Sequence, residues 1–144
     1  MMTKNYIRCF ILIFLTFVAC TKDEFEGPSL QNLYGDFSIS SPFIISNSTP
    51  NFTNNETVKF FCDFNKSVDW KITIKGLQTG SIKEITGFSD IIDSNVVSWN
   101  GNTSKVPFFG EETCALELSF LTEPDTIRDT LVITGNKIYD GILV

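Results

Sequence analysis

The chain has 144 residues, with 17 acidic residues against 11 basic ones and no histidine. The net charge of −6 argues against a nucleic-acid partner, because phosphate backbones repel an acidic surface. The missing histidine removes the commonest general base and the commonest metal ligand, which argues against many classes of enzyme.

The first 19 residues have the pattern of a secretory signal peptide. Lys4 and Arg8 precede an apolar run from Cys9 to Ala19. A membrane-spanning helix needs about 20 apolar residues, so this shorter run fits a signal peptide better than a stable span. We therefore expect residues 1–19 to direct export and then to be removed.

The end of this segment, Phe-Val-Ala-Cys at residues 17–20, resembles the processing box of bacterial lipoproteins. It is similar to the looser boxes of lipoproteins from the Bacteroidota. In that family the cysteine becomes the new N-terminus and carries the lipid, so the resemblance implies lipidation of Cys20. Several acyl chains hold a protein stably on a membrane. The alternative is an ordinary signal peptide that a cysteine follows by chance.

The next residues, Lys-Asp-Glu at 22–24, resemble the export tag of the same lipoproteins. The resemblance implies an outer-membrane, lipid-anchored and surface-exposed protein, and the periplasmic face of that membrane is the alternative location. Removal of residues 1–19 would leave nine basic and 17 acidic residues, a net charge of −8.

The remaining chain is divided into a tether and one domain. Residues 20–35 are acidic, contain Gly27 and Pro28, and have no periodicity, so we predict an acidic tether there. Residues 36–144 have the length of one domain. The apolar ending leaves open that the natural chain continues past Val144, in which case the domain is the N-terminal module of a longer surface protein.

Alternation of apolar and polar residues predicts short strands throughout the domain. A turn is predicted at residues 65–67, where Asn-Lys-Ser separates two alternating segments. No segment after residue 19 has a helical period, so we expect an all-β sandwich of about 7–9 short antiparallel strands. The predicted strands are residues 37–45 with a break at Pro42, 57–64, 69–76, 82–88, 95–99, 113–121 and 126–134.

From residue 69 to residue 135 the sequence resembles the immunoglobulin-like module of flagellar hook-capping proteins and of many bacterial surface proteins. Asn100 stands where that pattern has Asp, and Cys114 stands near a position that is usually aromatic. The resemblance implies an immunoglobulin-like β-sandwich that packs, spaces or binds, and it implies no catalysis. The matching segments are WKITIKG, TGSIKEITGFS, SWNGNTSKVPFFG, CALELSF and DTLVITG.

Cys62 and Cys114 are each predicted on the inward face of a strand. In an exported sandwich they are candidates for a disulfide between the two sheets. The long loop that this bond would close gives about 4 kcal/mol of stabilisation in the chain-entropy treatment. The alternative is two buried thiols that pack as small apolar side chains.

No motif predicts catalysis, a cofactor or a metal. The sequence has no phosphate-binding glycine loop, no nucleophile elbow and no EF-hand spacing. The acidic groups are interpreted as solvated charges, and we predict that the protein is not an enzyme. These groups are Asp23/Glu24/Glu26, Asp90/Asp93 and Glu111/Glu112.

Phe108 and Phe109, in the loop at residues 102–111, are candidates for stacking on a sugar ring, as is Phe61. The alternative for these rings is a second buried face or a contact with a neighbouring domain. We expect a non-catalytic binding or spacer module that contacts another surface protein. A glycan-binding accessory lipoprotein of an outer-membrane polysaccharide-uptake system is the alternative function.

Overall fold

The structure is a computed structural model that describes residues 35–139. The predicted signal peptide, Cys20 and all but the last residue of the predicted tether lie outside the described residues, as do residues 140–144.

The described residues form strands and one short 3-10 turn, and their strand pairings are all antiparallel. This arrangement confirms the all-β prediction. The elements are β1 (Ile39–Ile45), η1 (Phe52–Asn54), β2 (Val58–Gly76), β3 (Ile82–Ile92), β4 (Ser98–Trp99), β5 (Thr113–Phe120) and β6 (Thr126–Val132).

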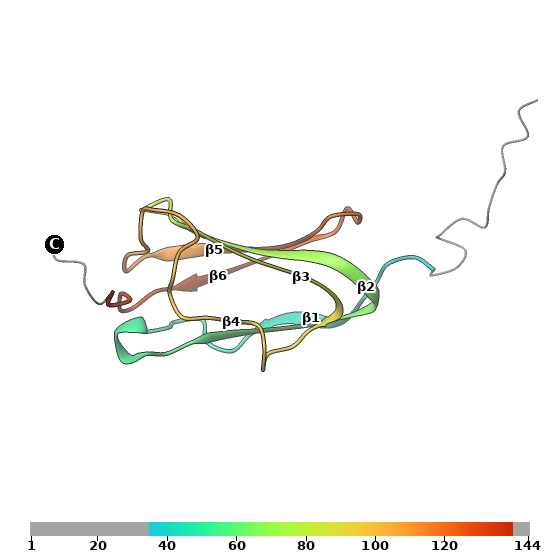
Figure 1. Cartoon of the computed structure of the whole chain (residues 1–144), viewed down its shortest axis with the longest axis horizontal. Helices are drawn as coiled ribbons and strands as arrows, with labels where there is room; N and C mark the ends of the chain where they lie inside the picture. The colour runs from blue at the N-terminus through green and yellow to red at the C-terminus, as the bar shows by residue number, and fades with distance from the viewer. Residues whose placement is uncertain (1–34, 140–144) are drawn as a thin grey trace, which may run out of the picture. The chain divides into compact units, whose positions relative to one another are not determined.

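β2 runs through the whole sheet and bends at its middle (Figure 1). Its first half pairs with β1 and β4, and its second half pairs with β5 and most of β3. A register shift between Asp63 and Val68 marks the bend. The sheet therefore curls, and its two halves face each other across the core.

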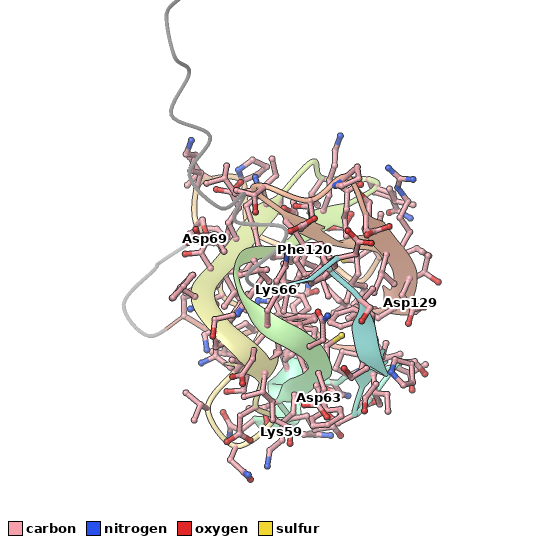
Figure 2. The ribbon with its side chains drawn as sticks, turned by 90° about the vertical axis from the view of Figure 1, so that its right-hand side faces the viewer. Lys59, Asp63, Lys66, Asp69, Phe120 and Asp129 are labelled. Atoms are coloured by element: carbon pink, nitrogen blue, oxygen red, sulfur yellow. The ribbon has the colours of Figure 1, made fainter. Side chains whose placement is uncertain are left out.

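The turn predicted at residues 65–67 is wrong, because β2 continues through them. The Asn65 side chain donates to the carbonyl of Asp36 at 2.8 Å and accepts from the N–H of Ser38 at 2.9 Å. Lys66 lies 2.9 Å from the carboxylate of Glu123. These contacts with distant segments hold the bend in strand geometry. Figure 2 looks onto this bend, with Lys66 near its centre.

The core lies between the two halves of the sheet. Buried side chains occupy even-numbered positions of β2 on both sides of the bend, from Val58 to Ile74. Successive strand residues point to opposite faces, so both halves of β2 turn the same set of residues inward. β5 lies beside the second half of β2, and its inward residues alternate in the same way from Cys114 to Phe120.

Aromatic rings fill both ends of this core. The ring of Trp99 contacts Phe52 and Phe109, with centroids 4.8 and 5.0 Å apart. Near the bend, Phe64 and Phe120 lie 5.2 Å apart in an edge-to-face arrangement. Such pairs contribute about 0.5–1.5 kcal/mol each beyond the burial of their area.

On one side of the molecule, backbone hydrogen bonds join the end of β6 to residues 48–52. Val132 and Thr134 donate to the carbonyls of residues 48 and 50 at 2.8 and 2.9 Å, and Phe52 donates to Gly135 at 2.9 Å. We call residues 132–135 together with residues 48–52 the β6 side. It connects the two halves of the curled sheet through main-chain groups.

Candidate functional site

The structure separates the two phenylalanines that were predicted to stack on a ligand. Phe109 is 7% exposed, and its ring packs against Trp99 in the core. Phe108 is 39% exposed, and its ring lies 4.4 Å from that of Tyr139. The two rings do not form one stacking surface, because Phe109 belongs to the core. Phe61 is only partly exposed.

Cys62 and Cys114 are both buried, and both are free thiols in the structure. Cys62 lies opposite Ile92 in β3, whereas Cys114 lies between Gly76 and Leu131. The predicted disulfide is therefore not formed in this structure: both thiols are buried, and that of Cys62 donates to the carbonyl of Ser41 at 3.3 Å. Burial, with Asp63 nearby, raises the pKa of the Cys62 thiol to about 11. Burial and Glu112 raise the pKa of Cys114 to about 12.

Glu112 was interpreted as a solvated charge, and this interpretation is wrong. The residue is 3% exposed, and its carboxylate accepts four hydrogen bonds. The donors are the backbone N–H groups of Gln78, Thr79 and Gly110 and the hydroxyl of Thr79, at 2.5 to 3.1 Å. Glu112 therefore fixes the turn between β2 and β3 to the loop before β5, which is a structural role.

The hydrogen bonds also decide the ionisation of Glu112. Burial alone would raise the pKa of its carboxyl group, but the bonds from Thr79, Gln78 and Gly110 outweigh burial and lower the pKa below its ordinary value of 4.5. Gly76 leaves room for this carboxylate, because a Cβ at residue 76 would lie 2.5 Å from Oε1 of Glu112.

An apolar surface surrounds Gly87 of β3, and the sequence interpretation missed it. Gly87 lies opposite Trp70, whose ring covers it so closely that a Cβ at residue 87 would lie 2.3 Å from Cζ2 of Trp70. The indole N–H of Trp70 donates to the hydroxyl of Ser89 at 2.9 Å. A single glycine inside a strand pattern indicates close approach, so Gly87 was the signal available in the sequence.

A hollow of about 570 Å³ lies on the outer face of β2, beside this glycine. Phe88 and Leu121 flank Asp69 from the two neighbouring segments, and Phe88 is 69% exposed. Lys71 also lines the hollow and forms an ion pair with Glu84 at 3.6 Å. We call this space the outer hollow. Its lining combines apolar side chains with charged groups and with the hydroxyl groups of Thr86 and Ser119.

A second hollow, of about 480 Å³, lies between β3 and residues 93–98. Its lining includes Trp70, Ile91 and Val96, and the side chains of Ile91 and Val96 are exposed. We call this space the edge hollow. Figure 1 shows β3 for most of its length in the other half of the curled sheet from β4.

Comparison with protein-family models, with curated proteins and with solved structures found no match. Within residues 35–139 no helix is long and apolar enough to cross a membrane. The same described part of the chain contains no cluster of three or more cysteine or acidic side chains arranged to hold a metal ion.

Proposed function

We propose that this protein is a lipid-anchored module of the outer membrane, exposed at the cell surface, which binds another molecule and catalyses no reaction. The observation that carries the binding role is the apolar surface around Gly87, where Phe88, Leu121 and Val96 are exposed beside two hollows. Large apolar side chains that gather on one face of a protein often mark a contact surface.

The anchor rests on the Phe-Val-Ala-Cys sequence at residues 17–20. Replacement of Cys20 by Ser is expected to abolish labelling by palmitate and to leave the protein outside the membrane fraction, because the lipid has no attachment point. A circular-dichroism spectrum with the same strand signal would show that the domain still folds. A Cys20→Ser protein that labels with palmitate would contradict the proposal.

The exposed orientation rests on Lys-Asp-Glu at residues 22–24. We expect external protease to digest the protein on intact cells, and we expect replacement of these three residues by Ser-Ser-Ser to make it resistant. Resistance of the unaltered protein on intact cells, with digestion after the outer membrane is opened, would place it on the periplasmic face.

We propose further that the curled sheet is an immunoglobulin-like β-sandwich in which additional short strands bring the number to seven or more. Two observations support this. β2 passes from one half of the sheet to the other, and residues 48–52 pair in parallel with the end of β6 after β1 has paired with β2. A crystal structure of the exported protein, or strand pairings from nuclear Overhauser effects, would test the number of strands.

A glycan is the second candidate ligand, and the outer hollow favours it over the predicted Phe108–Phe109 site. Phe88 provides an exposed aromatic face, while Thr86, Ser119 and Asp69 provide hydroxyl and carboxylate groups in the same space. Its volume falls within the range of ordinary ligand pockets. Binding on a glycan array that Phe88→Ala abolishes and Phe108→Ala preserves would support a glycan, and an array without signal would reject it.

A further inference from the structure

We propose that β3 accepts an extended segment of a partner polypeptide as an additional antiparallel strand, along its free edge from Ile85 to Ser89. The inference rests on the proposed binding function and names the class of partner. Addition of a strand to a sheet edge uses main-chain hydrogen bonds for affinity and the alternating side chains for specificity.

The first step is the direction of the backbone groups in β3. The carbonyl of Ile82 accepts from the N–H of Ser104 at 2.9 Å, and the N–H of Glu84 donates to the hydroxyl of Ser104 at 3.1 Å. Residues 82 and 84 thus direct their main-chain groups away from β2. Because this direction alternates along a strand, Thr86 and Phe88 direct theirs the same way.

The pairing of β2 gives the same result independently. Asp69 lies opposite Phe88, and its carbonyl accepts from the N–H of Leu121 on the other side of β2. Asp69 and Phe88 are therefore a pair without mutual hydrogen bonds. Within residues 35–139 no segment pairs with Thr86 or Phe88 on the outer edge, since the contact with loop 103–105 ends at Glu84.

The second step is the lack of protection on this edge. Natural proteins protect edge strands with proline, charge, irregular register or a covering segment. β1 has Pro42 and two register shifts, and β6 has Arg128 and Asp129 before it joins residues 48–52. In contrast, residues 85–89 of β3 read Ile-Thr-Gly-Phe-Ser, with neither charge nor proline, and the register shift of β3 comes only after Ser89.

The third step is the set of side chains that an added strand would meet. One face of that strand would lie over the edge hollow, next to Ile91 and Val96, and the other would lie beside the exposed ring of Phe88. Apolar side chains would therefore suit both faces of the added strand at its centre.

Charge distinguishes a partner from a second copy of this chain. In the symmetric antiparallel pairing of two β3 strands about Gly87, Glu84 of each copy would lie near Asp90 of the other at the ends of the pairing, and like charges brought together across a sheet destabilise it. Asp90 directly follows the free edge and Asp93 lines the edge hollow. We therefore assign the edge to a partner whose apolar segment is flanked by Lys or Arg.

The test uses the full processed protein in detergent micelles and a library of labelled seven-residue peptides. Each peptide has Lys at both ends and varied Val, Ile, Thr and Phe between them. We expect members of the library to bind by fluorescence anisotropy, and we expect at least about tenfold weaker binding when Glu replaces the terminal Lys residues. Binding by no member, or equal binding of the Glu-flanked peptides, would overturn the inference.

Two further measurements test the strand pairing itself. Amide exchange at Thr86 and Phe88 should slow by about tenfold or more on addition of the peptide, whereas exchange at Ile85 and Gly87, which already face β2, should change little. Peptides N-methylated at the alternate positions that face β3 should lose binding, and those methylated at the other positions should keep it. Peptide binding without protection of Thr86 and Phe88 would reject strand addition.

A matched pair of variants completes the design. Thr86→Pro removes the outward N–H at a position where an edge strand tolerates proline, so it should abolish peptide binding, whereas Thr86→Val should preserve it. If Thr86→Pro does not fold, the exchange measurement decides alone. Binding of a polysaccharide without any peptide binding would reject strand addition and leave the binding module intact, whereas failure of the Cys20 test would reject the anchor alone.

Discussion

On the β6 side, main-chain hydrogen bonds join the two halves of the curled sheet. On the other side, which consists of residues 85–98 and which we call the β3 side, the end of β3 pairs with the first half of β2 and the edge hollow separates residues 85–89 from residues 93–98. The β6 side has three such bonds between residues 132–135 and residues 48–52. The β3 side has the exposed side chains of Phe88, Ile91 and Val96 around the edge hollow.

This difference shows that one side of a curled sheet can be closed by main-chain hydrogen bonds while the other side stays open to a partner. Backbone groups that are paired across a gap stabilise the fold and offer nothing to a partner. Unpaired backbone groups beside apolar side chains add little to stability, but they can pair with another chain. Substitutions on the β6 side should therefore lower the free energy of unfolding, and those on the β3 side should mainly reduce binding.

The largest effect is expected at Glu112, which supports the start of β3 through its side chain and the end of β6 through its carbonyl. Glu112→Ala should lower the free energy of unfolding by about 3 kcal/mol near neutral pH, because buried N–H donors lose a charged acceptor. Urea unfolding would measure this loss.

The pH dependence of the same site gives a separate check. Folding lowers the pKa of Glu112, so the ionised carboxyl stabilises the fold fully above its ordinary pKa of 4.5 and loses this contribution as pH falls through the lower folded value. The difference between the natural protein and Glu112→Gln should thus shrink on acidification from about pH 7 to about pH 3. A difference that stays constant would contradict this account.

On the β6 side, Gly135→Ala should cost about 2 kcal/mol in the free energy of unfolding. A Cβ there would lie 2.2 Å from Oδ1 of Asn51, so one of the two segments must move. Oδ1 of Asn51 is buried without a hydrogen-bond partner, and the double variant with Asn51→Ala should therefore recover part of the loss. Additive losses in the double variant would show that the clash is not the cause.

On the β3 side, Gly87→Ala should cost about 1 kcal/mol, because the exposed edge can relax more easily than the β6 side. The new methyl group would displace the ring of Trp70. The chain has two tryptophans, so the indole N–H signals in an NMR spectrum would report each ring separately. The Trp70 signal should shift while that of Trp99 stays; a shift of the Trp99 signal alone would contradict this prediction.

The smallest effect on stability is expected for Phe88→Ala, at most about 0.5 kcal/mol, because the side chain is mostly exposed. The same variant should lose binding of the Lys-flanked peptides. Phe108→Ala is the matched control, since its ring is also exposed but contacts Tyr139 away from β3. A large loss of stability in Phe88→Ala would contradict the claim that substitutions on the β3 side mainly reduce binding.

The strand pattern could be predicted from the sequence because alternation is a local property. Residues 57–64, 69–76 and 113–121 alternate clearly, and all of them except Thr57 and Leu121 lie in β2 or β5. The bend at residues 65–67 could not be predicted in this way. Asn65 and Ser67 favour turns by composition, whereas contacts of Asn65 with Asp36 and Ser38 and the ion pair of Lys66 with Glu123 hold this segment in β2.

The site was less predictable, because burial of single residues depends on distant partners. Glu112 is buried because its hydrogen-bond donors include Gln78 and Thr79, more than 30 residues earlier. Phe109 is buried by Trp99, and no periodicity in its loop distinguishes it from the exposed Phe108. Gly87 was visible in the sequence, but its meaning depends on Trp70 in the opposite strand.

Because β2 is one continuous strand, the number of residues at its bend decides which side chains of its second half face the core. Both halves of the strand turn even-numbered residues inward, so an insertion of one residue between Phe64 and Val68 would reverse the second half. Lys71 and Lys75 would then face the core, and Trp70 would face solvent. An insertion of two residues would preserve both faces. Length variants at this bend should therefore be tolerated only when the number of added or removed residues is even.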